Sequence, residues 1–218
     1  MARSRAQARE ETTAAILAAA RKEIAELGGV GLSMRAVARE AGLVSSAVYR
    51  YFPSREALLT AMIIESFDHL ADTLETIPKA RPDRRWRALG LALRAWAHEN
   101  PHEFQLIYGT PVPGYVAPPE TIPAAGRVAR PFLEVAAVRG VPAFASSRLE
   151  RQFRPVAAEE ALSSTGFAAT VAELAALVGF VGLELAGHFV GTADPADHLY
   201  AALLDRQCGT LGLGQRAG

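Results

Sequence analysis

The chain has 218 residues, of which 50% are hydrophobic and 21% charged, and it contains a single cysteine, Cys208. This length and apolar content argue for a folded protein of one or two domains and against a disordered chain. One cysteine excludes an internal disulfide framework and a zinc cluster built from thiolates. The N-terminus lacks the apolar segment of a secretion signal, and the longest charge-free stretch of the apolar C-terminal region, 174–183, is too short to span a bilayer. The composition therefore predicts a soluble, cytoplasmic protein with no membrane partner.

The net charge is zero, but the charges are unevenly distributed. Residues 1–60 carry nine Lys or Arg and six Asp or Glu, whereas the remaining residues carry 14 and 17. The N-terminal part is therefore the one suited to face a polyanion. Arg3, Arg5 and Arg9 at its start form either a flexible arm for a DNA minor groove or a solvated tail.

Helical periodicity runs along the whole chain. A first helix is expected over 12–27 and is ended by Gly28. Ser33 can cap a second helix over 34–41, Gly42 ends it, and a third short helix follows over 45–51. Further helices are expected over 54–76, 83–100, 102–108, 121–138, 156–163, 167–191 and 195–207. No run alternates with period two over the length of a strand, so the predicted fold is all-α.

Five prolines lie close together between the expected helices, at 111, 113, 118, 119 and 123. Proline locks φ and has no backbone N–H, so the 111–123 segment is expected to be an extended ordered loop or a lid. Both interpretations stay open.

Residues 33–52 have the pattern of a helix-turn-helix. Ala38 is a small residue four positions before Gly42, and Val48 is an apolar residue six positions after it. This spacing lets the second helix project as a rod that fits the major groove of DNA. Its outward positions are expected to be Ser45, Ser46, Ala47, Tyr49 and Arg50.

The same region resembles the DNA-binding domain of the tetracycline-repressor (TetR) family of bacterial transcription regulators. The similarity covers residues 12–63 and rests on GLSMR at 31–35 and on AGLVSSAVYRYFPSREALL at 41–59. The resemblance implies an N-terminal three-helix DNA-binding domain at 1–53 and a larger helical domain at 54–218. It also implies that DNA is contacted by Ser33, Arg35, Ser45, Ser46, Ala47, Tyr49, Tyr51 and Arg55. Val44 departs from the family, which often has a capping Ser or Thr there, so either Ser45 caps the helix one residue later or the helix begins uncapped.

The second domain resembles one actinobacterial subgroup of this family, the WHG type, in PHEFQLIYGTPVPGY and LELAGHFVG. The resemblance implies a ligand-sensing domain whose last two helices, near 167–191 and 195–207, form a dimer interface. The segment 171–191 is apolar nearly all round and rich in small residues, which fits burial by its own domain and by a symmetry mate. The alternative is a central helix of a monomer.

Aromatic and polar side chains of the second domain define a candidate effector pocket. Its members are Trp96, Phe104, Tyr108, Phe132, Phe180, Glu184 and His188. The alternative for the aromatic residues is plain core. Glu184 and His188, one helical turn apart, are either a polar anchor or metal pair in the pocket or a structural hydrogen-bonded pair.

The string His98-Glu99-Asn100-Pro101-His102 matches the H-E-x-x-H signature of zinc hydrolases. That signature needs both histidines on one face of an unbroken helix, and Pro101 is expected to end the helix at Asn100. An enzyme is therefore an alternative that the sequence disfavours, and no catalytic residue, metal or cofactor is expected.

A helical scaffold that uses its helix-turn-helix for protein contacts is a second alternative. The favoured prediction is a homodimeric repressor that binds a palindromic DNA operator and is released by an unknown small-molecule effector.

Overall fold

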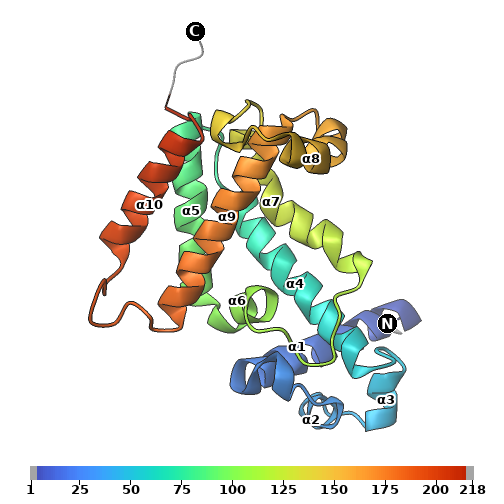
Figure 1. Cartoon of the computed structure of the whole chain (residues 1–218). Coiled ribbons are helices and arrows are strands. Elements are labelled where there is room, and N and C mark those ends of the chain that lie inside the picture. The colour runs from blue at the N-terminus through green and yellow to red at the C-terminus, as the bar shows by residue number, and fades with distance from the viewer. Residues whose placement is uncertain (1–3, 215–218) are drawn as a thin grey trace. The chain divides into compact units, whose positions relative to one another are not determined.

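The computed structural model describes residues 4–214, which fold into helices and loops without a strand (Figure 1). The predicted all-α class is confirmed. The helices are α1 (Arg5–Gly31), α2 (Met34–Glu40), α3 (Ser45–Tyr49), α4 (Arg55–Glu75), α5 (Pro82–Glu99), α6 (Pro101–Tyr108), α7 (Ile122–Ala136), α8 (Ser147–Glu159), α9 (Ser164–Leu185) and α10 (Asp197–Thr210). Short 3₁₀ segments at Pro119–Thr121 and Pro142–Phe144 precede α7 and α8.

The chain divides into two compact units. Unit 1 contains the residues up to 67 together with 100–123, and unit 2 contains 68–99 and the residues from 124 onward. The boundary expected after residue 53 differs from this division, because residues 54–67 and 100–123 pack with unit 1. Helix α4 begins in unit 1 and ends in unit 2.

Helix α1 begins seven residues earlier than expected. Ser4 and Gln7 form a reciprocal capping box, with both hydrogen bonds at 3.1 Å, and this starts the helix at Arg5. The chain kinks at Gly28, where φ is +68°, which is the position predicted to end the helix. The buried face of α1, with Ile16, Ala20 and Ile24, packs on α2 and α4 in the core of unit 1.

The proline-rich loop belongs to the core of unit 1. Val112 and Tyr115 pack against that core, and the Tyr115 hydroxyl shares a 2.9 Å hydrogen bond with Thr60 of α4. Residues 111–118 contain no helix, as predicted. The rest of the segment predicted as a loop, 119–123, is helical, because Pro119 begins a 3₁₀ turn and α7 starts at Ile122. These contacts describe an anchored loop, and whether it also acts as a lid stays a prediction.

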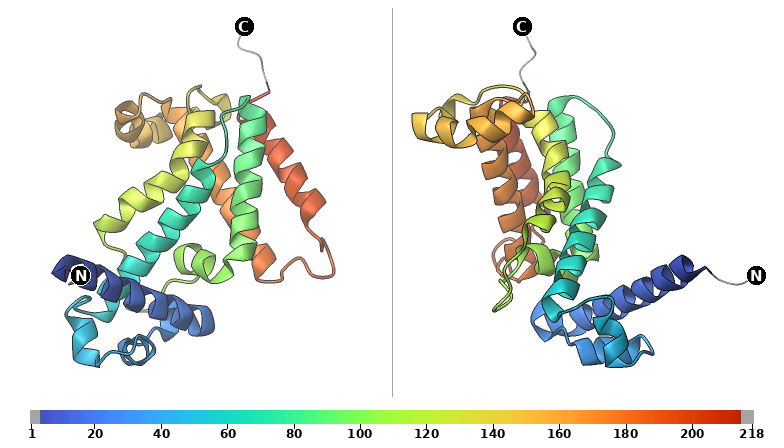
Figure 2. Two further views of the ribbon diagram at one scale, coloured as in Figure 1. Left: turned by 180° about the vertical axis from the view of Figure 1, so that it is seen from behind. Right: turned by 90° about the vertical axis from the view of Figure 1, so that its right-hand side faces the viewer.

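Unit 2 is built around a buried polar connection between helices. The indole N–H of Trp86 on α5 donates a 3.0 Å hydrogen bond to the Gln207 side chain on α10, whose amide donates at 2.8 Å to the backbone carbonyl of Glu173 on α9. Trp86 also meets the ring of Phe132 on α7 edge-on at 5.2 Å. Figures 1 and 2 show α5, α9 and α10 side by side in this unit. Each buried polar atom in this connection has a partner, so the desolvation cost is offset.

Two arginines add ion pairs within unit 2. Arg94 on α5 donates two hydrogen bonds to the Glu184 carboxylate, at 2.6 and 2.8 Å, and a third at 2.8 Å to Asp197 at the start of α10. Arg127 on α7 pairs with Asp68, Asp72 and Glu75, which lie on one face of α4. These contacts tie α9 and α10 to α5, and α7 to α4.

The structure corrects two helix predictions. The helix expected over 156–163 is α8, which begins at Ser147 under a Ser146 cap, carries Pro155 inside it and ends at Glu159. The helix expected to continue to 191 ends at Leu185, and Gly187 and Gly191 adopt φ near +77° in the turn that follows. The cap at Ser146 and the positive φ of Gly187 are the local features that set these two ends.

Helix α9 is long and apolar enough, by length and composition, to cross a membrane, and such a signal is weak for a single helix. It carries Glu173, a buried carboxylate that pairs with Arg206 at 3.0 Å. It packs against α5 and α8 on one side, while Val171 and Leu183 are 40% and 48% exposed. These contacts are those of a core helix that leaves one apolar face uncovered.

Candidate nucleic-acid interface

The helix-turn-helix is formed by α2, a tight turn and α3. Gly42 in the turn has φ of +67°, a backbone conformation that favours glycine, and the Leu43 N–H donates at 2.8 Å to the Ala38 carbonyl. Val37, Ala38 and Val48 are buried and join the two helices to the core of unit 1. The predicted roles of the small residue, the glycine and the apolar residue are confirmed.

Helix α3 presents most of its predicted outward residues to solvent. Ser46, Tyr49 and Arg50 are exposed, with Tyr49 at 48%, and Ser45 is half-buried. Ala47 is buried at 7%, so the prediction that its side chain faces outward is wrong. Ala47 and Val48 are the two buried residues of α3. Because the helix has only five residues, it needs both of them for packing, and Ala47 is not left to face solvent.

The start of α3 has no side-chain cap. Val44 occupies the cap position, is 69% exposed, and makes no capping hydrogen bond. Of the two alternatives for this departure from the family pattern, the uncapped start is the one found. Ser45 is then the first helical residue, which leaves its hydroxyl free of a capping role.

Ser33 and Arg35 lie at the start of α2. The Ser33 hydroxyl accepts the backbone N–H of Ala36, which confirms the predicted cap. Arg35 is exposed, and neither Arg35 nor Arg50 forms an ion pair within residues 4–214. Both guanidinium groups are therefore available to a phosphate.

Arg55 has a structural role that the sequence does not reveal. Its guanidinium donates to the carbonyls of Leu32, Gly29 and Val30, at 2.8, 2.8 and 2.9 Å, at the end of α1. These carbonyls have no partner within the helix, so Arg55 caps α1 from the first turn of α4. A DNA contact by Arg55 stays a prediction, since two of its three nitrogens are already used.

Tyr51 is half-buried, and its ring is covered by an arginine from the other end of the unit. The guanidinium of Arg9 on α1 lies 5.4 Å from the centre of the Tyr51 ring, within cation–π range. The sequence carried no signal for this contact, because 42 positions separate the two residues.

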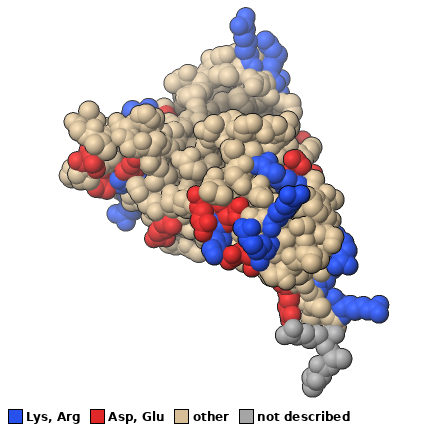
Figure 3. Space-filling model, turned by 90° about the horizontal axis from the view of Figure 1, so that it is seen from below, with Lys and Arg blue, Asp and Glu red and all other residues tan. Residues whose placement is uncertain are grey.

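Charged side chains of both signs are spread over the face shown in Figure 3, with blue groups among red and tan ones. Ion pairs such as that of Lys22 with Glu40, at 2.8 Å, account for some of the acidic groups in unit 1. Arg35 and Arg50, which have no ion pair within residues 4–214, are close in sequence to the outward residues of α3.

Family comparisons agree with this geometry. Residues 16–62 match the family described as "Bacterial regulatory proteins, tetR family". Residues 86–207, more than half of the chain, match the family described as "Tetracyclin repressor-like, C-terminal domain". The chain belongs to the tetracycline-repressor family. Members of this family are DNA-binding transcription regulators rather than enzymes, and the helix-turn-helix is their DNA-binding element. The resemblance to the WHG subgroup stays a prediction.

Curated relatives support the assignment. The regulators Rv1816 of Mycobacterium tuberculosis and Mb1846 of Mycobacterium bovis, both described as HTH-type transcriptional regulators, are 43% identical over 141 residues. The match covers 61% of this chain and 59% of each relative, so it spans less than two thirds of the relatives' length.

Solved structures show the same fold over nearly the whole chain. The structure of SCO4313 superposes with a TM-score of 0.79 at 28% identity and covers 95% of this chain and 100% of its own. A Rhodococcus protein gives 0.69 at 23% identity, over 94% and 96% of the two chains. NalD, the secondary repressor of a multidrug efflux pump in Pseudomonas aeruginosa, gives 0.54 at 19% identity, over 91% and 95%, and shares the fold alone.

The residues of the candidate effector pocket are divided between the two units, and the pocket stays a prediction. Phe104 and Tyr108 lie in unit 1, where their rings are in contact and burial raises the pKa of Tyr108 to about 12. Trp96 and Phe132 are buried in unit 2, and Phe180 contacts the rings of Phe189 and Tyr200.

The expected pair of Glu184 and His188 is not formed. Because α9 ends at Leu185, His188 lies beyond the helix and is exposed. Glu184 pairs with Arg94 and accepts from His98 Nε2 at 3.1 Å. The Arg94 guanidinium, and to a lesser degree His98, lower the pKa of the Glu184 carboxyl. Glu184 is therefore a structural anchor between α5 and α9.

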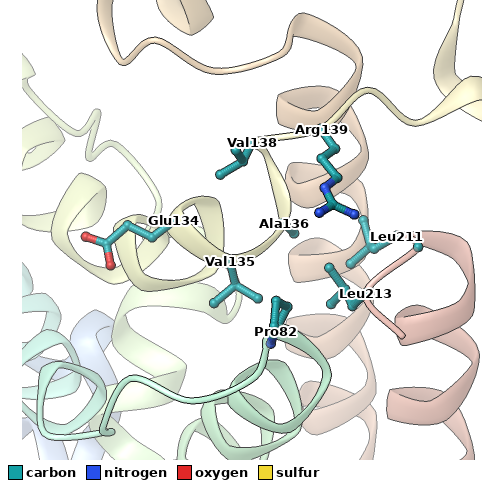
Figure 4. Close-up of a pocket in the computed structure, with 9 residues that line it drawn as sticks. Pro82, Glu134, Val135, Ala136, Val138, Arg139, Leu211 and Leu213 are labelled. Carbon is teal, nitrogen blue, oxygen red and sulfur yellow. The ribbon is translucent and has the colours of Figure 1, made fainter. Parts of the chain in front are cut away.

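Unit 2 has hollows elsewhere. One, of about 210 Å³, lies between the start of α5, the end of α7 and the residues after α10 (Figure 4). It is apolar apart from Arg139 and Glu134, and Figure 4 shows the Arg139 side chain extending toward Leu213. A more open groove is lined by Leu91, Arg94, Ala95, His98 and Asp197. Neither contains an aromatic residue of the predicted pocket.

The H-E-x-x-H string is broken as predicted. Helix α5 ends at Glu99, α6 begins at Pro101, and Asn100 between them is not helical, with φ of −128° and ψ of 55°. His98 and His102 therefore lie on different helices and in different units. Within residues 4–214, no group of three or more His, Cys, Asp or Glu side chains is placed to hold a metal ion.

Proposed function

We propose that this protein is a cytoplasmic repressor that binds a palindromic operator as a homodimer and is released by a small molecule. The observation that carries the proposal is the exposed surface of α3, where Ser46, Tyr49 and Arg50 face solvent beside a buried packing face. Hydroxyl and guanidinium groups are the donors that contact bases and phosphates in a major groove. With Ser33, Arg35, Ser45 and Tyr51 they form the proposed DNA-contacting set.

A homodimer is supported by the uncovered face of unit 2. Leu183 on α9 and Leu199 on α10 are 48% and 46% exposed, and Val171 is 40% exposed. A Cβ added to Gly179 would meet nothing within 4 Å, so packing within the chain does not require glycine there. Small and apolar exposed residues allow a helix of a second copy to approach closely, and two recognition helices specify more base pairs than one.

A ligand would act through unit 2, and α4 is the proposed connection to the helix-turn-helix. Arg55 at its first turn holds the end of α1, while Asp68, Asp72 and Glu75 near its last turns hold Arg127. A ligand that moves α7 would therefore pull on α4 through Arg127. A coupling free energy of about 1–3 kcal/mol between the ligand and the DNA is typical of such devices.

The experiment is to select duplexes from a random DNA pool with the full-length protein and to map the protected bases. We expect two half-sites whose centres lie about one helical turn apart, roughly 10 base pairs, and two protomers per duplex by sedimentation. Tyr49→Phe should weaken binding several-fold at fixed salt while leaving the melting temperature unchanged. Failure to select any duplex, even at low salt, would favour the scaffold alternative.

The dimer is tested by Leu183→Arg, which places a charge on the uncovered face of α9. Sedimentation should show a monomer, and operator affinity should fall because half-sites are then bound singly. The matched control is Val156→Arg on α8, a residue that is also 48% exposed. A Leu183→Arg protein that remains a dimer would contradict the proposed interface.

A further inference from the structure

Of the three arginines expected in an arm or tail, Arg5 and Arg9 lie in the first turns of α1, and Arg3 lies outside the described residues. The Ser4–Gln7 capping box starts the helix, and its axis then continues to the buried residue Ile16. Arg9 lies seven residues before Ile16, which is two helical turns along the same face. The position of Arg9 is therefore set by the packing of α1 in unit 1.

Arg9 differs from two basic residues further along α1, which are paired with carboxylates. Arg21 is paired with Glu65, and Lys22 with Glu40. Arg9 is exposed, forms no ion pair within residues 4–214, and rests on the ring of Tyr51. An aromatic face restricts the guanidinium without neutralising its charge, so its N–H donors stay available for an anion.

Tyr51 places this cation beside the recognition element. It follows the exposed Tyr49 by two residues and Arg50 by one, and its backbone N–H donates at 2.9 Å to the Val48 carbonyl of α3. The guanidinium of Arg9 is thus carried within about 5 Å of a ring that is fixed to the end of α3. Glu10 lines a surface groove of α1 together with Arg9, and Arg5, one helical turn before Arg9, is also exposed.

We propose that Arg9 is a further DNA-contacting residue, a phosphate anchor that α1 supplies next to the end of α3 and that Tyr51 holds in place. The contact would be to the DNA backbone and would therefore strengthen binding to any sequence. This inference rests on DNA binding by the helix-turn-helix, and it extends the interface to an element outside that motif.

The experiment measures the salt dependence of binding for the full-length protein, with a duplex selected by the wild type and with a random duplex. Arg9→Gln should lower the slope of log affinity against log salt concentration by about 1 per protomer and weaken both duplexes by the same factor. Arg9→Lys keeps the charge and should retain the wild-type slope. Arg148→Gln on α8 removes an equal charge from an exposed helix of unit 2 and should change nothing.

Each other outcome overturns the inference. If Arg9→Gln has the same slope as the wild type, Arg9 makes no phosphate contact. If Arg148→Gln changes the slope by the same amount as Arg9→Gln, the effect is one of net charge and not of a contact at Arg9. A slope that Arg9→Lys does not restore indicates a packing role on Tyr51 instead. A wild-type protein that selects no duplex contradicts the DNA-binding function itself and is recognised before any variant is made.

Discussion

The two units are stabilised in different ways. Unit 1 has an apolar core in which Ile16, Val37, Val48 and Leu58 are completely buried. Its buried Thr60 and Thr121 hydroxyls donate to backbone carbonyls three or four residues earlier in their own segments. Unit 2 places Gln207, fully buried, and Glu173, 5% exposed, among its helices and connects them to Trp86.

The two kinds of core suit different tasks, one the support of a DNA-binding element and the other a fixed arrangement of helices. Unit 1 needs only a rigid support from which exposed groups reach DNA, and an apolar core meets that need. The buried polar bonds of unit 2 fix which helix faces which, because a shifted helix would leave a polar atom without a partner. The proposed response of unit 2 to a ligand and to a second copy would benefit from such a defined arrangement of helices.

The largest expected effect is that of Trp86→Ala. It removes the biggest fully buried side chain of unit 2 and leaves Gln207 without its donor, and we expect a loss of about 4 kcal/mol in unfolding free energy. Urea denaturation followed by circular dichroism measures the loss. Trp86→Phe, which keeps a ring against Phe132, should lose less. If both variants lose the same amount, the hydrogen bond rather than packing dominates.

Arg94→Leu should have the next largest effect. Glu184, whose side chain is 12% exposed, would lose its bidentate partner, and we expect a loss of roughly 2 kcal/mol because the pair borders an open groove. The double variant Arg94→Leu/Glu184→Leu should recover part of this loss. Arg127→Leu breaks three ion pairs, but these are more exposed to solvent, so the loss of unfolding free energy should be smaller. A greater loss in Arg127→Leu would contradict the importance given to burial.

The same pair predicts a dependence of stability on pH. Arg94 lowers the pKa of Glu184 below its ordinary value of 4.5 in the folded protein. The pair therefore contributes fully above the unfolded pKa, and its contribution is lost as the pH falls through the folded pKa. Melting temperatures between about pH 6 and pH 3 should fall less steeply for Glu184→Gln than for the wild type. Parallel curves would show that this carboxyl contributes nothing to acid sensitivity.

A smaller, stabilising effect is expected in unit 1. Val44→Ser supplies the missing cap of α3 without touching the core, since Val44 is 69% exposed. We expect a gain of about 1 kcal/mol, measured as a higher urea midpoint. Val44→Ala is the control and should give no gain. If Val44→Ser gives none either, the short helix is already held fully by Ala47 and Val48.

Local patterns were sufficient to predict much of unit 1. A cap at Ser33, a turn at Gly42 and apolar residues at Val37 and Val48 act within a few residues of one another, so their spacing can be interpreted without coordinates. The same reasoning failed where a neighbour overrides a local preference. Pro155 lies inside α8, and Ala47 belongs to the buried face of a helix too short for periodicity to define its faces.

By itself, then, the sequence determined the all-α class, the helix-turn-helix, the family, and the break between His98 and His102, because each depends on interactions between near neighbours in the chain. Only the tertiary structure decided that Arg55 caps α1, that Arg9 covers Tyr51, and that Glu184 pairs with Arg94 rather than with His188. Those partners are 23 to 90 positions apart. Long polar side chains find such partners by the packing of whole helices, and no spacing along the chain records that packing.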